Sequence, residues 1–141
     1  MTKINGNIQI GNTGYSLNRL VPYVLYNNSD GASTDITLND NYTNYKYLDI
    51  YCKDTYVGSY FSIRVDLSVS MYFMVSANVS RSGYNGFMAI AKQFYLTNYN
   101  KLYKNIYADF VGIYCSRYSN TYEYFNSDNY DILIVKVVGY K

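Results

Sequence analysis

The chain has few residues that could carry out a reaction. Its 141 residues include no histidine, which is the side chain most used as a general base, as the partner of a nucleophile and as a zinc ligand. The two cysteines, Cys52 and Cys115, lack CxxC spacing and have no imidazole to activate them. We predict no catalytic residue, no metal and no cofactor, and we expect the protein not to be an enzyme.

The carboxylates leave two other chemistries open. Asp128 and Asp131, with Asn126 and Asn129 between and before them, could supply oxygen ligands to calcium, although the same residues also suit an ordinary turn. A glycoside hydrolase needs two carboxylates across a cleft, and the acids of this chain give no positive support for such a pair. The phosphate-binding and nucleophile motifs GxGxxG, GK[ST] and GxSxG are absent from the sequence.

Recognition without reaction is the chemistry that the sequence favours. The segment 117–130 reads RYSNTYEYFNSDNY, in which aromatic faces could stack on sugars or side chains while amides and carboxylates bond to hydroxyls. The candidate binding residues are Tyr118, Tyr122, Glu123, Tyr124, Asn126 and Asp128. The alternative is that Tyr122 and Tyr124 form a further strand or pack a loop against the domain.

The overall composition excludes several partner classes. A formal net charge of +2 is too small and too scattered for binding to a nucleic-acid backbone or to an anionic membrane surface. The sequence contains neither a secretory apolar run nor a membrane-length apolar stretch. We therefore expect no nucleic acid and no membrane insertion, and a chain that is made in a cytoplasm with reduced thiols.

Strands must position these residues, because apolar and polar residues alternate along most of the chain. Odd positions from Phe61 to Val79 are almost all apolar and the even ones mostly polar, with a break expected near 66–68. In segment 45–54, Leu48, Ile50 and Cys52 share the inward face, whereas Tyr45, Tyr47, Asp49, Tyr51 and Lys53 share the other. The same pattern turns Cys115 inward.

The fold class predicted from this alternation is all-β, an antiparallel β-sandwich of jelly-roll-like type with about eight or nine strands. Turn-forming residues separate the strands, and the 21 tyrosines suit half-buried strands. The strands are expected near 7–11, 21–27, 33–38, 45–53, 58–65, 69–77, 87–96, 111–118 and 130–138.

Three regions depart from this simple pattern. Segment 95–110 mixes helical and strand spacing, and we expect it to be irregular or strand-like. The last strand is apolar on both faces, so we expect it to be covered on both sides, either by a second subunit or by the chain's own loops. Residues 1–20 are expected to form an N-terminal arm or first strand, and residues 21–141 the sandwich domain.

Segments 25–31 (LYNNSDG), 35–38 (DITL), 45–54 (YKYLDIYCKD) and 132–141 (ILIVKVVGYK) resemble small β-structured virion proteins of tailed bacteriophages. The resemblance implies a tail-fibre, baseplate or head-fibre domain, commonly a trimeric β-sandwich that binds glycans or proteins of the host surface. It transfers no functional residue, since the matching positions are of scaffold type.

Taken with the resemblance, the sequence predicts a peripheral virion protein that recognises a host surface glycan or protein through loops rich in Tyr and Asn. We expect a homotrimer that contacts other virion proteins and resides in the virion. The alternative is an architectural capsid decoration or head-fibre protein with no host ligand. A phage glycan hydrolase is the third hypothesis.

Overall fold

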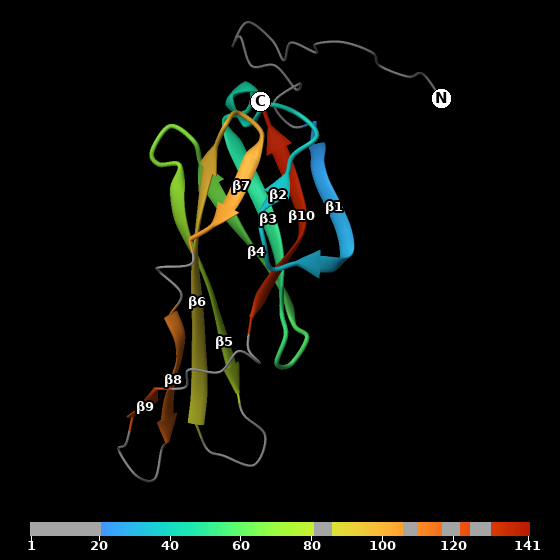
Figure 1. Ribbon diagram of the computed structural model, residues 1–141. Coiled ribbons are helices and arrows are strands. Elements are labelled where there is room, and N and C mark those ends of the chain that lie inside the picture. Colours follow the sequence, from blue (N-terminus) through green and yellow to red (C-terminus); the bar gives the residue numbers. More distant parts are fainter. Residues whose placement is uncertain (1–20, 81–85, 106–109, 117–121, 125–130) are drawn as a thin grey trace, which may run out of the picture.

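The computed structural model describes residues 21–80, 86–105, 110–116, 122–124 and 131–141. It confirms the predicted all-β antiparallel sandwich: every pairing between described strands is antiparallel, and two sheets face each other (Figure 1). The described residues contain ten strands, because two short strands, at 101–104 and 122–124, join eight of the nine predicted ones. The expected strand at 7–11 and the proposed arm lie outside the described residues.

The first sheet has four strands in the order β1-β10-β3-β4. Their bounds are Tyr23–Ala32 for β1, Ile132–Tyr140 for β10, Tyr47–Asp54 for β3 and Tyr60–Asp66 for β4. The last strand of the chain lies between the first and the third, a non-sequential order shared with Greek-key and jelly-roll sandwiches.

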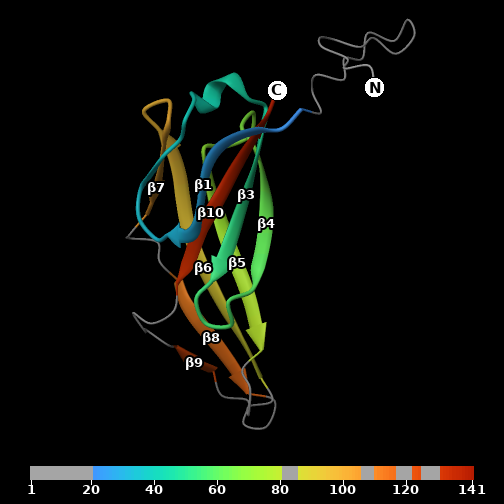
Figure 2. The same cartoon turned by 90° about the vertical axis from the view of Figure 1, so that its right-hand side faces the viewer.

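The second sheet has six strands and is built around the long strand β6 (Gly86–Thr97). One edge of β6 pairs with β5 (Tyr72–Ser80), and the other pairs with β8 (Phe110–Ser116) and then with β7 (Lys101–Lys104). The strand β2 (Ile36–Thr37) extends the sheet beyond β7, and β9 (Tyr122–Tyr124) extends it beyond β8. Figure 2 shows that β8 and the lower part of β6 reach past the four-stranded sheet.

Alternation of residue type predicted which side chains face the core. Leu48, Ile50 and Cys52 are fully buried on the inner face of β3. The long alternating run divides into β4 and β5 at a turn over residues 67–69, close to the expected break, and Val65 and Val75 point inward on either side of it. Both sheets thus contribute to one apolar core.

Two expectations about individual segments need correction, and a third is confirmed. Tyr45 was placed on the outward face, but it precedes β3 and is buried, with its hydroxyl donating to Asp40 at 2.7 Å. The strand expected at 33–38 shrinks to the two residues of β2, because β1 continues to Ala32. Segment 95–110 was expected to be irregular or strand-like, and its described part is: it contains a hairpin from β6 to β7. The turn residues Asn98 and Tyr99 have left-handed φ values of 48° and 63°.

The apolar last strand is covered on both faces by this chain. Ile132, Ile134 and Val137 belong to the core cluster, while Val135 and Val138, outside that cluster, are only 8% and 3% exposed. A second subunit is therefore not required to cover β10, and the chain's own residues suffice. Within its sheet, β10 lies between β1 and β3.

Candidate functional site

An open groove lies across the outer face of the four-stranded sheet. It has a volume of about 540 Å³ and draws residues from all four strands. Its lining consists of Asn27, Ser29, Tyr51, Tyr60, Phe61, Ser62, Val135 and Lys136. The walls are therefore mainly aromatic and apolar, with a few amide, hydroxyl and ammonium groups, which is the composition of small-molecule sites.

A cross-strand row forms the floor of this groove. Asn27 of β1 pairs with Lys136 of β10, Lys136 pairs with Tyr51 of β3, and Tyr51 pairs with Ser62 of β4. Residues paired in this way point to the same side of the sheet. We call these four residues the open row.

A β-bulge in β10 is what brings Lys136 onto this face. The register between β10 and β3 shifts between Ile134 and Lys136, so one extra residue lies on the β10 side. Before the bulge, Ile132 and Ile134 face the core, and after it Val137 does. Without the bulge, even-numbered positions would continue inward and the lysine would point into the apolar interior.

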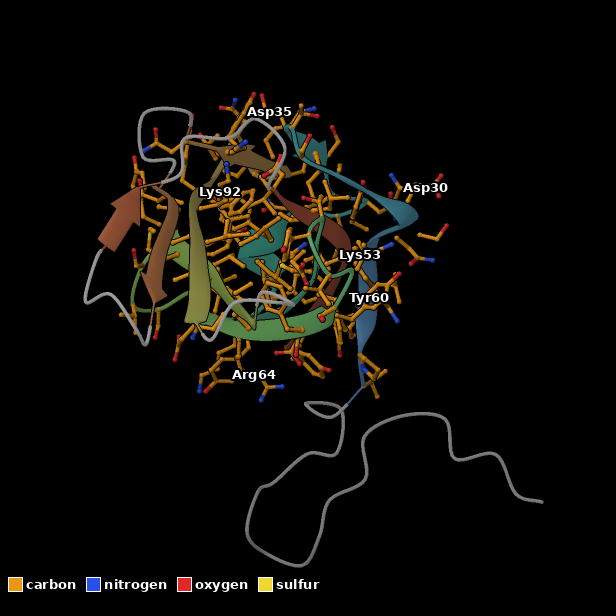
Figure 3. The ribbon with its side chains drawn as sticks, turned by 90° about the horizontal axis from the view of Figure 1, so that it is seen from below. Asp30, Asp35, Lys53, Tyr60, Arg64 and Lys92 are labelled. Carbon is orange, nitrogen blue, oxygen red and sulfur yellow. The ribbon has the colours of Figure 1, made fainter. Side chains whose placement is uncertain are left out.

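Each exposed tyrosine of the groove has a lysine over its ring. The Lys136 ammonium is 5.8 Å from the centre of the Tyr51 ring, and the Lys53 ammonium is 5.3 Å from that of Tyr60. Tyr51 is 36% and Tyr60 65% exposed. Figure 3 shows Lys53 and Tyr60 lying close together on this side of the sandwich. These are cation–π contacts at an exposed site, where such contacts are weak.

The next row along the same face, which we call the paired row, has its charges neutralised internally. It consists of Val24, Val138, Asp49 and Arg64. The Arg64 guanidinium donates two hydrogen bonds to the Asp49 carboxylate, at 2.7 and 2.8 Å, in the bidentate geometry that arginine favours. The hydrogen bond from Arg64 is the main cause that lowers the pKa of Asp49, so this pair stays ionised.

The outer face of the six-stranded sheet carries a different tyrosine cluster. Tyr72, Tyr95 and Tyr103 face one another across β5, β6 and β7, with successive ring centres 5.5 Å apart and nearly parallel planes. Because these rings stack on one another, their faces are largely occupied within the sheet. We interpret this row as a stabilising cross-strand ladder.

Half of the sequence-predicted site residues are described, and none of these three lines the groove. Tyr122, Glu123 and Tyr124 form β9, which pairs with β8 at the end of the six-stranded sheet. This matches the alternative in which those tyrosines form a further strand. Tyr118, Asn126 and Asp128 fall outside the described residues, and so do most of the calcium candidates. A binding role for this segment remains a prediction.

The groove residues were missed because no single segment of sequence contains them. The outward position of Tyr51 and Lys53 followed from alternation in β3. Their meeting with Lys136 depends on the register of a strand that is apolar on both faces. Such a strand has no alternation to fix its register.

The described reactive groups serve structural roles. Burial raises the pKa of the Cys52 thiol to about 12, so this thiol is protonated at neutral pH and a poor nucleophile. The buried Asp54 carboxylate accepts the backbone N–H groups of Val57 and Ser59 at 2.7 and 2.8 Å, which closes the turn between β3 and β4. Among the described residues, no group of three His, Cys, Asp or Glu side chains could hold a metal ion.

A second charged cluster closes the interior near the start of β10. Asp131 lies 3.5 Å from the Lys92 ammonium and 3.6 Å from that of Lys104. Lys92 is almost fully buried on β6, so removing Asp131 would take a carboxylate partner from a buried charge, which is costly. We interpret the cluster as a tie between the two sheets.

Comparison of the chain with protein-family models, with curated proteins and with solved structures found no match. No helix in the described ranges is long and apolar enough to span a membrane.

Proposed function

We propose that the chain is a non-catalytic recognition module that binds saccharide chains in the groove of the four-stranded sheet. The observation that carries the proposal is the pairing of two exposed tyrosine rings, Tyr51 and Tyr60, with hydrogen-bonding side chains in one open groove. Aromatic rings pack against the apolar faces of sugars, while amide and hydroxyl groups satisfy sugar hydroxyls.

The groove supports binding better than a reaction. Its lining residues include no carboxylate, whereas glycoside hydrolysis uses two flanking carboxyl groups. The hydroxyls of Ser29 and Ser62 have no imidazole partner, because the chain has no histidine. The hydrolase hypothesis therefore has no support from the groove.

The biological setting of the proposal comes from the sequence resemblance. A peripheral phage virion protein presents many copies of one site to a cell surface. Linked copies raise the effective concentration at each next site, so weak single contacts add to firm attachment. We propose a homotrimeric virion module that contacts other virion proteins and uses the groove to recognise host glycans.

Glycan-array binding by the full chain tests the saccharide proposal. We expect the wild-type protein to retain a defined group of glycans, and the variant Tyr51→Ala with Tyr60→Ala to lose them while keeping its circular dichroism spectrum. The matched control is Tyr95→Ala with Tyr103→Ala in the stacked ladder. Equal loss in both variants, or no retained glycan, would contradict a saccharide site in the groove.

An architectural role is the second candidate, and an exposed apolar margin favours it. Val69 is 80%, Tyr72 61%, and Met71 and Met74 each 48% exposed at the turn between β4 and β5 and along β5. A concentrated apolar patch of this kind marks a contact with another protein. We propose that it packs against a second copy of the chain.

Light scattering tests this second role. A trimer that becomes a 16.3 kDa monomer on Val69→Asp would support packing through the margin. A wild-type protein that is monomeric at high concentration would contradict both the trimer and the architectural role.

A further inference from the structure

We propose that the saccharide bound in the groove is acidic, with a carboxylate that meets Lys136 and a second that meets Lys53. This inference rests on the proposed saccharide-binding function and names the chemical class of its ligand.

Lys136 lines the groove and Lys53 lies beside it, over the ring of the lining residue Tyr60. Among the described residues, neither Lys53 nor Lys136 forms an ion pair with a carboxylate, whereas Arg64 on the neighbouring row is held by Asp49 at 2.7 Å. Asp30 lies on β1 beside the groove residue Ser29, and it also makes no ion pair with either lysine. The face therefore presents two uncompensated ammonium groups beside an open aromatic floor.

The lysine positions suit a charged group on the rim of a sugar ring. Each ammonium lies over one tyrosine ring, at 5.8 Å for Lys136 and 5.3 Å for Lys53. A pyranose ring stacked on Tyr51 would carry a ring carboxylate outward at its edge, within reach of the flexible lysine chain. A carboxylate is a stronger partner for the ammonium than the exposed ring, so binding would draw the lysine aside and uncover the aromatic face.

The duplication of this arrangement indicates an oligomer. Tyr51 with Lys136 and Tyr60 with Lys53 form two ring-and-cation pairs on adjacent rows of the same groove. A polymer with a carboxylate on each of two neighbouring sugar units can engage both pairs. A single acidic sugar can engage only one of them, and linking two contacts in one ligand raises affinity.

Calorimetry with two matched ligands tests the inference on the full chain. The probes are a linear oligomer of galacturonic acid and the same oligomer with its carboxylates methyl-esterified. We expect the acid to bind at least about tenfold more tightly than the ester. Raising the salt concentration until the Debye length falls from about 10 Å to about 3 Å should weaken binding of the acid and leave binding of the ester unchanged.

Charge-neutral variants locate the effect. Lys136→Gln should remove most of the difference in affinity between the acid and the ester, and Lys53→Gln should remove a smaller part of it. The matched control is Lys46→Gln, which removes an equal charge from a lysine 5.1 Å from the centre of the Tyr47 ring, near the paired row. This control should leave the affinity for the acid unchanged, and all three variants should keep the wild-type melting temperature within a few degrees.

The results of these measurements distinguish failure of the acidic-ligand inference from failure of the proposed saccharide binding. Equal binding of acid and ester, unaffected by Lys136→Gln, would overturn the acidic ligand and leave saccharide binding standing. Absence of binding to either oligomer, together with an empty glycan array, would overturn both. Equally tight binding of inorganic polyphosphate would show unselective attraction to positive charge, and would also overturn the inference.

Discussion

Two neighbouring rows on one face of the four-stranded sheet handle positive charge in opposite ways. In the paired row, Arg64 is fixed by a bidentate contact with Asp49. In the open row, Lys136 lies over the ring of Tyr51 and forms no ion pair with any carboxylate of the described residues. A paired charge is satisfied within the fold and contributes modestly to stability. The unpaired charge beside an open groove is available to a ligand, and this difference locates the candidate site.

The groove depends first on the path of β1, and Gly31 offers the largest test. Gly31 has φ +79°, and an added Cβ would lie 2.6 Å from Leu133 Cβ. We expect Gly31→Ala to lower the free energy of unfolding by about 2 to 4 kcal/mol, from backbone strain plus overpacking, and to reduce ligand binding in the open row. Chemical denaturation measures the first effect.

Gly58 supplies the matched control for this substitution. It has the same φ of +79°, but its added Cβ would meet only Lys53 Cε at 3.8 Å. Gly58→Ala should therefore cost about 1 to 2 kcal/mol from strain alone. Equal losses for the two glycines would show that the contact between β1 and β10 does not constrain the groove wall.

The next largest effect is the loss of one tyrosine from the open row, compared with the loss of one beside the paired row. Tyr51→Ala removes an aromatic ring from the floor of the groove and should weaken saccharide binding by about tenfold to a hundredfold. Tyr47→Ala, on the same strand and face but beside Arg64, should change binding less than about twofold. Titration calorimetry of both variants checks this. A larger loss at Tyr47 would place the ligand on the paired row.

Removing the carboxylate of Asp49 should give the paired row an unpaired cation, as in the open row. Asp49→Asn leaves Arg64 without its carboxylate partner, so we predict a second, weaker acidic-oligomer site on the same face. The stoichiometry from calorimetry should rise above that of the wild type. An unchanged stoichiometry, in a variant with unchanged circular dichroism, would show that the open row owes its role to features other than an uncompensated cation.

The smallest effect is a difference in acid stability. Asp49 has a pKa lowered mainly by its hydrogen bond from Arg64, so at low pH the unfolded chain takes up its proton first. The contribution of Asp49 is therefore present above the unfolded carboxyl pKa of about 3.9 and is lost as pH falls through the lower folded value. The free energy of unfolding of the wild type should exceed that of Asp49→Asn by an amount that decreases below about pH 4, as measured by denaturation at several pH values. A difference independent of pH would contradict the assignment.

Alternation of residue types was enough to predict the fold class and the inward faces. Leu48, Ile50 and Cys52 are buried as predicted, because a strand with one apolar face has one stable orientation. Tyr45 was assigned wrongly because it lies just before β3, where the period of the strand no longer applies. Local pattern therefore holds only within the element that produces it.

The candidate groove depended on information that local sequence does not contain. Lys136 faces outward because of a bulge in β10, and that strand is apolar on both faces, so no pattern marks the shift. Tyr51, Asn27 and Ser62 come together through pairings between distant segments. The local cluster of tyrosine and asparagine in the sequence predicted a site at residues 117–130 instead.

The most direct test of the account is amide chemical-shift mapping of the labelled full chain during titration with the galacturonic acid oligomer. We predict that the largest chemical-shift changes fall on the amides of Asn27, Tyr51, Ser62 and Lys136, and that the amide shifts of Tyr72, Tyr95 and Tyr103 do not change. Shifts concentrated on that ladder or within residues 117–130, with the groove amides unmoved, would contradict it.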